Sequence, residues 1–270
     1  MNQQVFKMRH YLHVFIQIWK RSAAHILEYR LNIFIQGAFI LVYLVGMLMM
    51  LEIIFSNTQS LGGWSKSEVI LLYGICGIMW GLIELVYFSS LMHFMMRGVS
   101  TGELDTILTK PLDAQFLTLF SYPAMMEFIY PFSSALFTGW VLLTQHYSFS
   151  LESVFTFFAS IILTQILLLF LFSAYSSLAF FVTKSQQVLR TLETLGDHSQ
   201  YPTIIYPQLL KLSLLSFLGV GLVGYIPTAF LLQKLPTLGL VPLFLGTCAT
   251  VFTSRFIWKF SLRRYSSASS

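Results

Sequence analysis

The chain has 270 residues, of which 56% are hydrophobic, and its mean hydropathy is +0.73. Only 10% of its residues are charged, whereas a soluble domain carries about a quarter. Because this few charged residues cannot cover a water-facing surface, the composition excludes a soluble globular protein. It indicates a polytopic membrane protein. In a soluble protein the net charge of +5 would suggest nucleic acid. Here we expect the basic residues to mark the cytosolic side of the membrane, and no nucleic-acid partner.

Residues 1–30 are too polar to cross a membrane. Five apolar side chains recur at helical spacing, with histidine, glutamine and basic residues on much of the opposite face: Met8, Tyr11, Leu12, Phe15 and Trp19. This pattern predicts an interfacial helix whose apolar face lies against the membrane and whose basic face meets anionic headgroups. The helix could be a simple anchor or an elbow that transmits force, and the pattern leaves both open.

Six later runs are long and apolar enough to be transmembrane helices. Their approximate bounds are Leu31–Phe55, Val69–Met95, Gln115–Leu143, Ser153–Thr183, Leu212–Leu232 and Leu238–Trp258. They lack the alternation of barrel strands. We therefore predict a single all-α membrane domain over residues 1–270, with a six-span bundle over 31–258 and a tail over 259–270.

Six spans place both termini on one side. All basic residues except Lys66 and Lys234 then fall on that side as well. The positive-inside rule makes this side cytosolic. We expect a multi-pass protein of the plasma membrane, or of the inner membrane in a Gram-negative cell, with both termini in the cytosol.

The connection between the second and third spans, STGELDTILTKPLD (residues 100–113), concentrates charge in a chain that has little. Ser100 and Glu103 fit a capping box. Four apolar residues then fall on one helical face: Leu104, Ile107, Leu108 and Leu112. Pro111 ends the regular helix at Lys110. The pattern predicts a short cytosolic surface helix with Glu103, Asp105 and Lys110 facing water or a partner; an ordinary connecting loop is the alternative.

Other positions carry weaker signals. Glu84 and Glu127 are the acids deepest in apolar sequence, and such residues are candidates for a transport path or for pairing inside the bundle. Gly77 and Gly81 form a GxxxG pattern that permits close packing of the second span on another helix. Three apolar residues of the connection between the fourth and fifth spans predict a second cytosolic surface helix: Val188, Leu192 and Leu195. No pattern of metal ligands or catalytic residues is present, so we expect no cofactor or metal in this chain.

The GELD stretch resembles a signature, G-E-L-D-x-x-L-x-[KR]-P-[LIV], of six-span permeases of type 2 ABC transporters. The matching residues are Gly102, Glu103, Leu104, Asp105, Leu108, Lys110, Pro111 and Leu112. GWSKSEVILLYG (63–74) and PTIIYPQLLK (202–211) are similar to other parts of that family. The resemblance implies that the GELD stretch is the coupling helix. It also implies a re-entrant outer segment between the last two spans, which residues 224–242 with their three prolines could form.

By this resemblance, the chain is a permease subunit that pairs with an identical or similar permease. It would be driven by a separate ABC ATP-binding subunit that holds ATP and Mg²⁺. The sequence contains no G-x-x-x-x-G-K-[ST] motif, so ATP hydrolysis is expected in that other chain. Export is the direction expected by analogy, and the sequence indicates no substrate. A membrane-embedded enzyme and a channel or scaffold protein are the alternatives; the enzyme would need convergent polar residues at one depth, and none is apparent.

Overall fold

The computed structural model describes residues 2–26, 30–145, 147–182, 185–216 and 218–265. Over these residues the protein is almost entirely helical, and the only β-type pairing among them is an isolated bridge between Leu61 and Trp64. The predicted all-helical class is therefore confirmed. Five helical stretches are long and apolar enough to cross a membrane: Leu31–Asn57, Lys66–Gly98, Met125–Thr144, Leu151–Phe180 and Thr237–Leu262.

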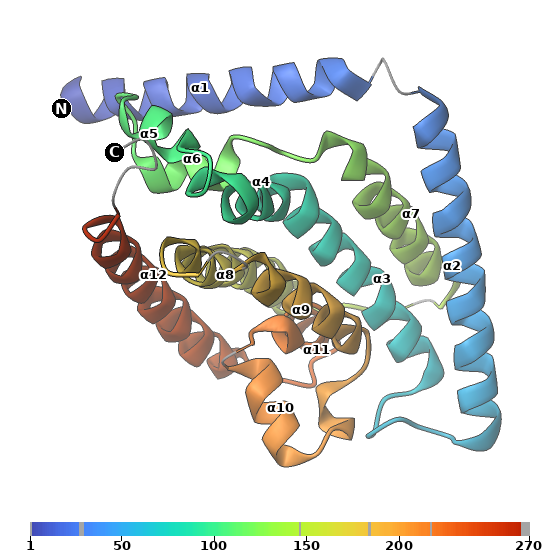
Figure 1. The fold of residues 1–270 in the computed structure, drawn as a ribbon. Helices are drawn as coiled ribbons and strands as arrows, with labels where there is room; N and C mark the ends of the chain where they lie inside the picture. Colours follow the sequence, from blue (N-terminus) through green and yellow to red (C-terminus); the bar gives the residue numbers. More distant parts are fainter. Residues whose placement is uncertain (1, 27–29, 146, 183–184, 217, 266–270) are drawn as a thin grey trace.

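The first two helices frame the molecule. α1 (Asn2–Ile26) lies across one end of the bundle, and α2 (Arg30–Asn57) runs along its side (Figure 1). The large apolar side chains of α2, such as Phe34 and Phe39, are mostly exposed. A helix that is apolar all round and exposed in this way is suited to contact lipid.

α1 does not rest on the membrane alone. Tyr11 and Phe15 pack edge-on against Phe116 and Phe120 of α6 (Ala114–Phe120), with ring centroids 4.9 and 5.5 Å apart. Edge-to-face aromatic pairs at this spacing are favourable. Part of the apolar face that was predicted to lie against the membrane therefore contacts protein, which joins the interfacial helix to the segment that follows the GELD stretch.

The second span begins at a capping box, in which the Ser65 side chain accepts from the backbone N–H of Glu68 and the Glu68 carboxylate accepts from that of Ser65. The first part of this span is α3 (Lys66–Ile83). It continues through three short segments, two of them π-helical: η1 (Glu84–Phe88), α4 (Ser89–His93) and η2 (Phe94–Gly98). π turns of this kind are rare and occur often at functional sites.

The GxxxG pattern packs α3 against α7 (Ile129–Thr144). A Cβ added at Gly77 would lie 2.4 Å from the Ser134 hydroxyl, and one added at Gly81 would lie 2.5 Å from Pro131 Cδ. Neither position has space for a methyl group. The two glycines therefore let the second and third spans approach closely. The helix that the GxxxG pattern contacts is thus α7.

The third span is shorter than the predicted Gln115–Leu143. α6 ends at Phe120, and the chain turns through Pro123 into η3 (Met125–Phe128) before α7 begins. Pro123 has no N–H to donate, and the next N–H, of Ala124, donates to the Leu85 carbonyl of the second span (3.1 Å). The helix is broken here, so the candidate span starts at Met125.

The fourth and last spans pack against each other. α8 (Leu151–Ser176) continues into η4 (Ser177–Phe180), and α12 (Leu240–Leu262) lies along it. The Thr247 hydroxyl donates to carbonyls of both helices, at 2.8 Å within α12 and at 3.3 Å to Leu163 of α8. These two spans agree with the sequence prediction to within a few residues.

The predicted cytosolic connection between the fourth and fifth spans is wrong over most of its length. Its elements are α9 (Gln186–Gly196), η5 (Asp197–Gln200) and η6 (Thr203–Ile205). Trp80, in the middle of the second span, donates to the Ser199 hydroxyl (2.9 Å). Ile204 lies beside Gly62, just before the start of α3. The segment therefore runs back along the second span to its far end.

α9 itself packs into the bundle: Leu189 and Leu192 on its apolar face are buried, and Val188 and Leu195 are partly buried. Its neighbours are α8 and η7 (Val220–Leu222). The predicted surface helix exists, but its apolar residues contact protein. Hydropathy failed to mark this stretch because its other face carries polar side chains.

The predicted continuous fifth span, Leu212–Leu232, is also wrong. α10 (Gln208–Leu215) and the stretch Val220–Leu231, which contains α11 (Tyr225–Leu231), are bent by 86° relative to each other. Gly219, with φ +70°, begins the second arm. This left-handed conformation is accessible to glycine at little cost and stops a helix.

The bent pair enters and leaves at the same end of the molecule. Ile204, just before it, contacts Gly62, and Lys234, just after it, donates to the carbonyl of Gly63 (3.1 Å). The pair is therefore a re-entrant segment. The re-entrant element predicted over residues 224–242 begins earlier than expected, at residue 208.

Figure 1 shows α1, α5 (Glu103–Leu108) and the last turns of α12 at one end of the molecule, and the α2–α3 connection with α10 at the other. This grouping agrees with the predicted common side of the first helix, the GELD stretch and the last helix. Lys211 departs from this prediction: it belongs to α10, which lies at the end of the molecule that holds the α2–α3 connection.

Candidate functional site

The GELD helix, α5, begins at a glycine instead of a capping box. Gly102 has φ 75° and provides no side-chain cap. The Ser100 hydroxyl instead donates to the Met96 carbonyl of the second span (3.1 Å). The predicted Ser100–Glu103 capping box is therefore wrong. The left-handed glycine turns the chain sharply out of the second span, which moves the serine away from the new helix.

Glu103 is held inside the protein. Its carboxylate bonds to His93 Nε2 (2.9 Å) and accepts from the hydroxyl of Tyr122, while the rings of His93 and Tyr122 stack with centroids 3.8 Å apart. The Glu103 side chain is only 25% exposed. This acid, expected to face water or a partner, instead ties the start of α5 to the second span and to the turn after α6. We call this group, Glu103 with His93 and Tyr122, the Glu103 anchor.

The Glu103 anchor shifts the pKa values of the Glu103 carboxyl group and of the Tyr122 phenol. Burial acts to raise the pKa of Glu103, but hydrogen bonds from Tyr122 and His93 and the nearby Arg97 outweigh it, so the pKa lies below the usual 4.5. Burial and the bond to Glu103 raise the pKa of Tyr122 to about 12. At neutral pH the group is therefore a carboxylate that accepts from a neutral phenol.

The two faces of α5 differ. Leu104 and Ile107 are buried, whereas Leu108, expected to hold the helix in place, is 42% exposed. Lys110 and Pro111, after the helix, are exposed as well. A helix this short turns about one residue per turn toward the protein. The Glu103 anchor sets the orientation of α5, so the inward residues are Leu104 and Ile107. The C-terminal end of the signature therefore presents an apolar side chain and a cation to the outside.

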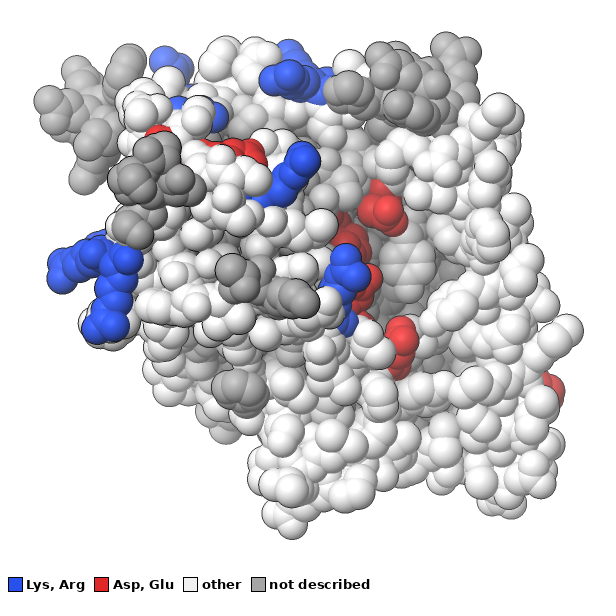
Figure 2. Space-filling view, in the orientation of Figure 1, with Lys and Arg blue, Asp and Glu red and all other residues white. Residues whose placement is uncertain are grey.

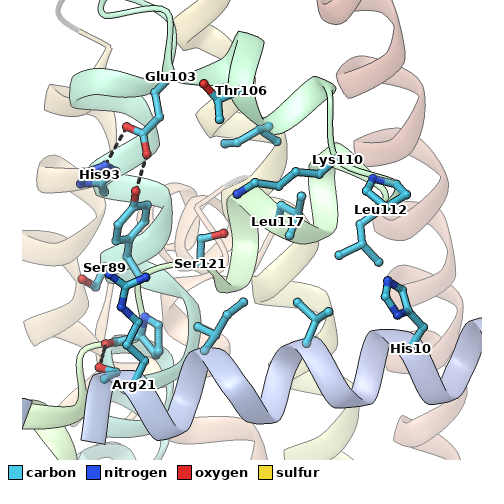
Figure 3. Close-up of a pocket in the computed structure, with 17 residues that line it drawn as sticks. His10, Arg21, Ser89, His93, Glu103, Thr106, Lys110, Leu112, Leu117 and Ser121 are labelled. Atoms are coloured by element: carbon cyan, nitrogen blue, oxygen red, sulfur yellow. Dashed lines mark hydrogen bonds and ion pairs between the residues drawn. The ribbon is translucent and has the colours of Figure 1, made fainter. Parts of the chain in front are cut away.

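A cleft of about 980 Å³ lies between α5 and α1. Figure 3 shows Lys110 extending into it from one wall, with His10 and Arg21 on the α1 side and the Glu103 anchor at its end. Apolar side chains such as Ile18 and Leu117 line it too. Its floor is tied to α1 by a hydrogen bond from the Ser22 hydroxyl to the Pro123 carbonyl (2.8 Å). The cleft combines apolar walls with two basic side chains, Arg21 and Lys110.

The structure brings the two deep acids together. Glu84 begins the π-helical segment of the second span, Glu127 lies in η3, and each is within electrostatic reach of Glu193 on α9. Asp197 and Arg190 interact with Glu193 in turn. Figure 2 shows acidic side chains gathered with basic ones in a hollow between α2 and the body of the bundle. Among the described residues, neither Glu84 nor Glu127 forms an ion pair.

Sequence reasoning missed the partners of these residues. Glu193 lies in the stretch that was predicted to be a second cytosolic surface helix, so no contact with the spans was expected of it. Nothing in the residue spacing pointed to the bond between His93 and Glu103. Each pairing joins segments whose relative position depends on the break at Pro123 or on the return of α9 into the bundle.

The family comparison agrees with this architecture. The family model described as ABC-2 family transporter protein matches residues 41–269, from the middle of the first span to the end of the chain. No curated protein and no solved structure shows a significant match to the sequence. The family match covers most of the chain and includes the GELD helix, the re-entrant segment and all later spans. The chain therefore belongs to the ABC-2 family of membrane transporter proteins.

Proposed function

We propose that this chain is the permease subunit of an exporter that works as a pair of permeases, identical or similar. A separate ATP-binding subunit would hold ATP and Mg²⁺ and drive it, and both termini and α5 would face the cytosol. The observation that carries the proposal is the site around α5. A short helix is fixed to the bundle at one end, exposes Leu108, and borders a cleft of about 980 Å³ shared with α1.

A partner protein suits this site better than lipid does. An exposed apolar side chain beside cations and a cleft offers the mixture of anchor, pocket and polar rim that protein interfaces use. The Glu103 anchor makes α5 a rigid part of the bundle, so a displacement imposed on α5 would reach the second span. We place the ATP-binding subunit on the outer face of α5 and in the cleft, with Asp105, Leu108 and Lys110 as contacts.

The experiment compares two arginine substitutions of exposed leucines. Leu108→Arg should weaken binding of the ATP-binding subunit that co-purifies with the wild-type permease by about tenfold or more, which is the size of an interface anchor. The control, Leu151→Arg, changes a residue that is 92% exposed at the start of α8, at the opposite end of that helix from η4. Equal retention of the ATP-binding subunit by both variants would refute this docking site.

We further propose that Glu84 and Glu127 belong to the transport path. Carboxylates within the depth of the membrane are costly and are retained where they do work. Their proximity to Glu193 supports this assignment. Glu84→Gln and Glu127→Gln should alter stimulation of ATP hydrolysis by transported compounds while the basal rate and assembly stay unchanged. Unaltered stimulation in both variants, across compounds that stimulate the wild type, would contradict it.

A further inference from the structure

Asp113, the residue that closes the GELD stretch, holds the far end of the coupling loop. Its carboxylate caps α6 by accepting from the N–H of Phe116 (2.9 Å). The same carboxylate receives Arg255 Nη1 of α12 on both oxygens, at 3.0 and 3.1 Å. The two residues are 142 positions apart. The loop that follows the second span is thereby joined directly to the last span.

A buried amide extends this contact. Gln115, which is 1% exposed, accepts from Arg255 Nη1 (2.8 Å) through its side-chain oxygen. Its side-chain nitrogen donates to Ser173 of α8 (2.8 Å) and reaches Ser254 of α12 at 3.3 Å. Both ends of the amide are occupied, so the group fixes the relative position of three segments.

The first helix is attached at the same point. The backbone N–H of Asp113 donates to the hydroxyl of Tyr11 (3.0 Å), whose ring packs on Phe116. Four elements, α1, α6, α8 and α12, therefore meet within three residues of the end of the GELD signature at Leu112.

The exposure of the Asp113–Arg255 pair indicates that it positions the segments more than it stabilises the fold. The Asp113 and Arg255 side chains are 40% and 42% exposed, and half-exposed ion pairs contribute little to stability. Apolar packing between α8 and α12 already holds those spans together. Arg255 Nη1 instead donates directional hydrogen bonds to both Asp113 oxygens and to Gln115 Oε1. These bonds fix one arrangement of α6 against α12, as satisfied polar networks do.

We propose that Asp113, Arg255 and Gln115 form a clamp that makes the GELD helix and the last span move as one body when the ATP-binding subunit acts. This inference rests on the proposed function, and it assigns positioning residues to it. The Glu103 anchor ties the start of α5 to the second span, and the clamp ties the end of the loop to the other half of the bundle. A single displacement at α5 is then delivered to both halves.

The test measures the distance between α5 and α12 by pulsed electron paramagnetic resonance. Spin labels are placed at Thr109 and at Phe256, both exposed, with the two native cysteines replaced. The permease is studied alone in nanodiscs, and in complex with its ATP-binding subunit with and without vanadate trapping. In the unsubstituted clamp we expect one narrow distribution that is the same in every state.

Asp113→Asn should broaden the distribution in the permease alone, and shift its mean in the trapped complex by more than the width of the nucleotide-free distribution. Arg255→Met removes the guanidinium but leaves the Asp113 carboxylate free to cap α6, and it should broaden the distribution as Asp113→Asn does, which separates the ion pair from the cap. Lys66→Gln, which breaks the ion pair with Glu52 at the other end of the molecule, serves as the control and should leave the distance unchanged.

Three results would overturn the clamp. The first is a wild-type distribution in Asp113→Asn, and the second is a wild-type distribution in Arg255→Met. A relative shift of α5 and α12 in the trapped wild-type complex would also refute it. Should no ATP-binding subunit assemble with the wild type, the proposed function fails, while the arm with the permease alone still decides whether the clamp sets the distance.

Discussion

Replacing Glu103 by glutamine tests whether α5, the proposed coupling helix, is fastened to the bundle from inside. The carboxylate bonds to His93 and Tyr122 and is only 25% exposed. A hydrogen bond to a charged group contributes about 1.5–3 kcal/mol. Glutamine keeps one acceptor oxygen and loses the charge, so we expect the attachment of α5 to weaken by about 1–2 kcal/mol, or roughly 5–30-fold in its local opening equilibrium.

Amide hydrogen exchange of the permease in nanodiscs measures this opening. Peptides covering residues 102–112 should exchange roughly 5–30 times faster in Glu103→Gln, because exchange follows the population of the locally open form. The control Glu152→Gln removes the same charge at the start of α8, where the carboxylate accepts from Thr237, and should leave these peptides unchanged. A change below twofold in Glu103→Gln would show that α5 is held by its buried leucine and isoleucine alone.

The pH dependence has a definite sign. The pKa of Glu103 is lowered in the folded protein. Its contribution is therefore fully present above the usual 4.5 and is lost as the pH falls through the lowered value. Protection of residues 102–112 should be constant from pH 7 to pH 5 and fall below pH 4.5, and this acid-induced loss should be absent in Glu103→Gln.

Three further predictions concern packing, orientation and activity. Gly81→Ala places a methyl group against Pro131 and should lower the melting temperature, at a cost of about 1–3 kcal/mol, whereas Gly37→Ala, with open space around it, should not. With the native cysteines replaced, a cysteine at Ser60 should react with an impermeant maleimide from outside intact cells and one at Thr109 should not; the reverse pattern would invert the topology. The purified chain should hydrolyse no ATP by itself, and turnover that survives removal of contaminating ATPases would contradict the permease assignment.

Much of the fold follows from hydropathy, and the failures have a common cause. Long apolar runs such as α2 face lipid, so the hydropathy of the run is enough to predict that it is a transmembrane helix. The segment over 186–205 runs along the second span with one polar face, because neighbouring helices and the hollow surround it. A window of average hydropathy cannot distinguish such a segment from a loop. The bend at Gly219 is likewise invisible, since both arms of the re-entrant pair are apolar.

The candidate site was predictable in location but not in its contacts. The charges and the signature marked residues 100–113, and α5 lies there. The sequence is equally compatible with a Glu103 that caps its own helix and with one that bonds to His93. The left-handed turn at Gly102 decides between them, and a turn of this kind depends on tertiary structure. For the same reason nothing near Asp113 pointed to Arg255, on the last span.

The central claim is that an ATP-binding subunit docks on the outer face of α5, and site-specific photocrosslinking tests it most directly. A photoreactive amino acid at Leu108, in permease purified together with its partners, should crosslink to a chain that contains a nucleotide-binding motif. The same amino acid at Leu151 should give no such product. Efficient crosslinking from Leu151 with none from Leu108, or crosslinking from Leu108 only to lipid, would contradict the account.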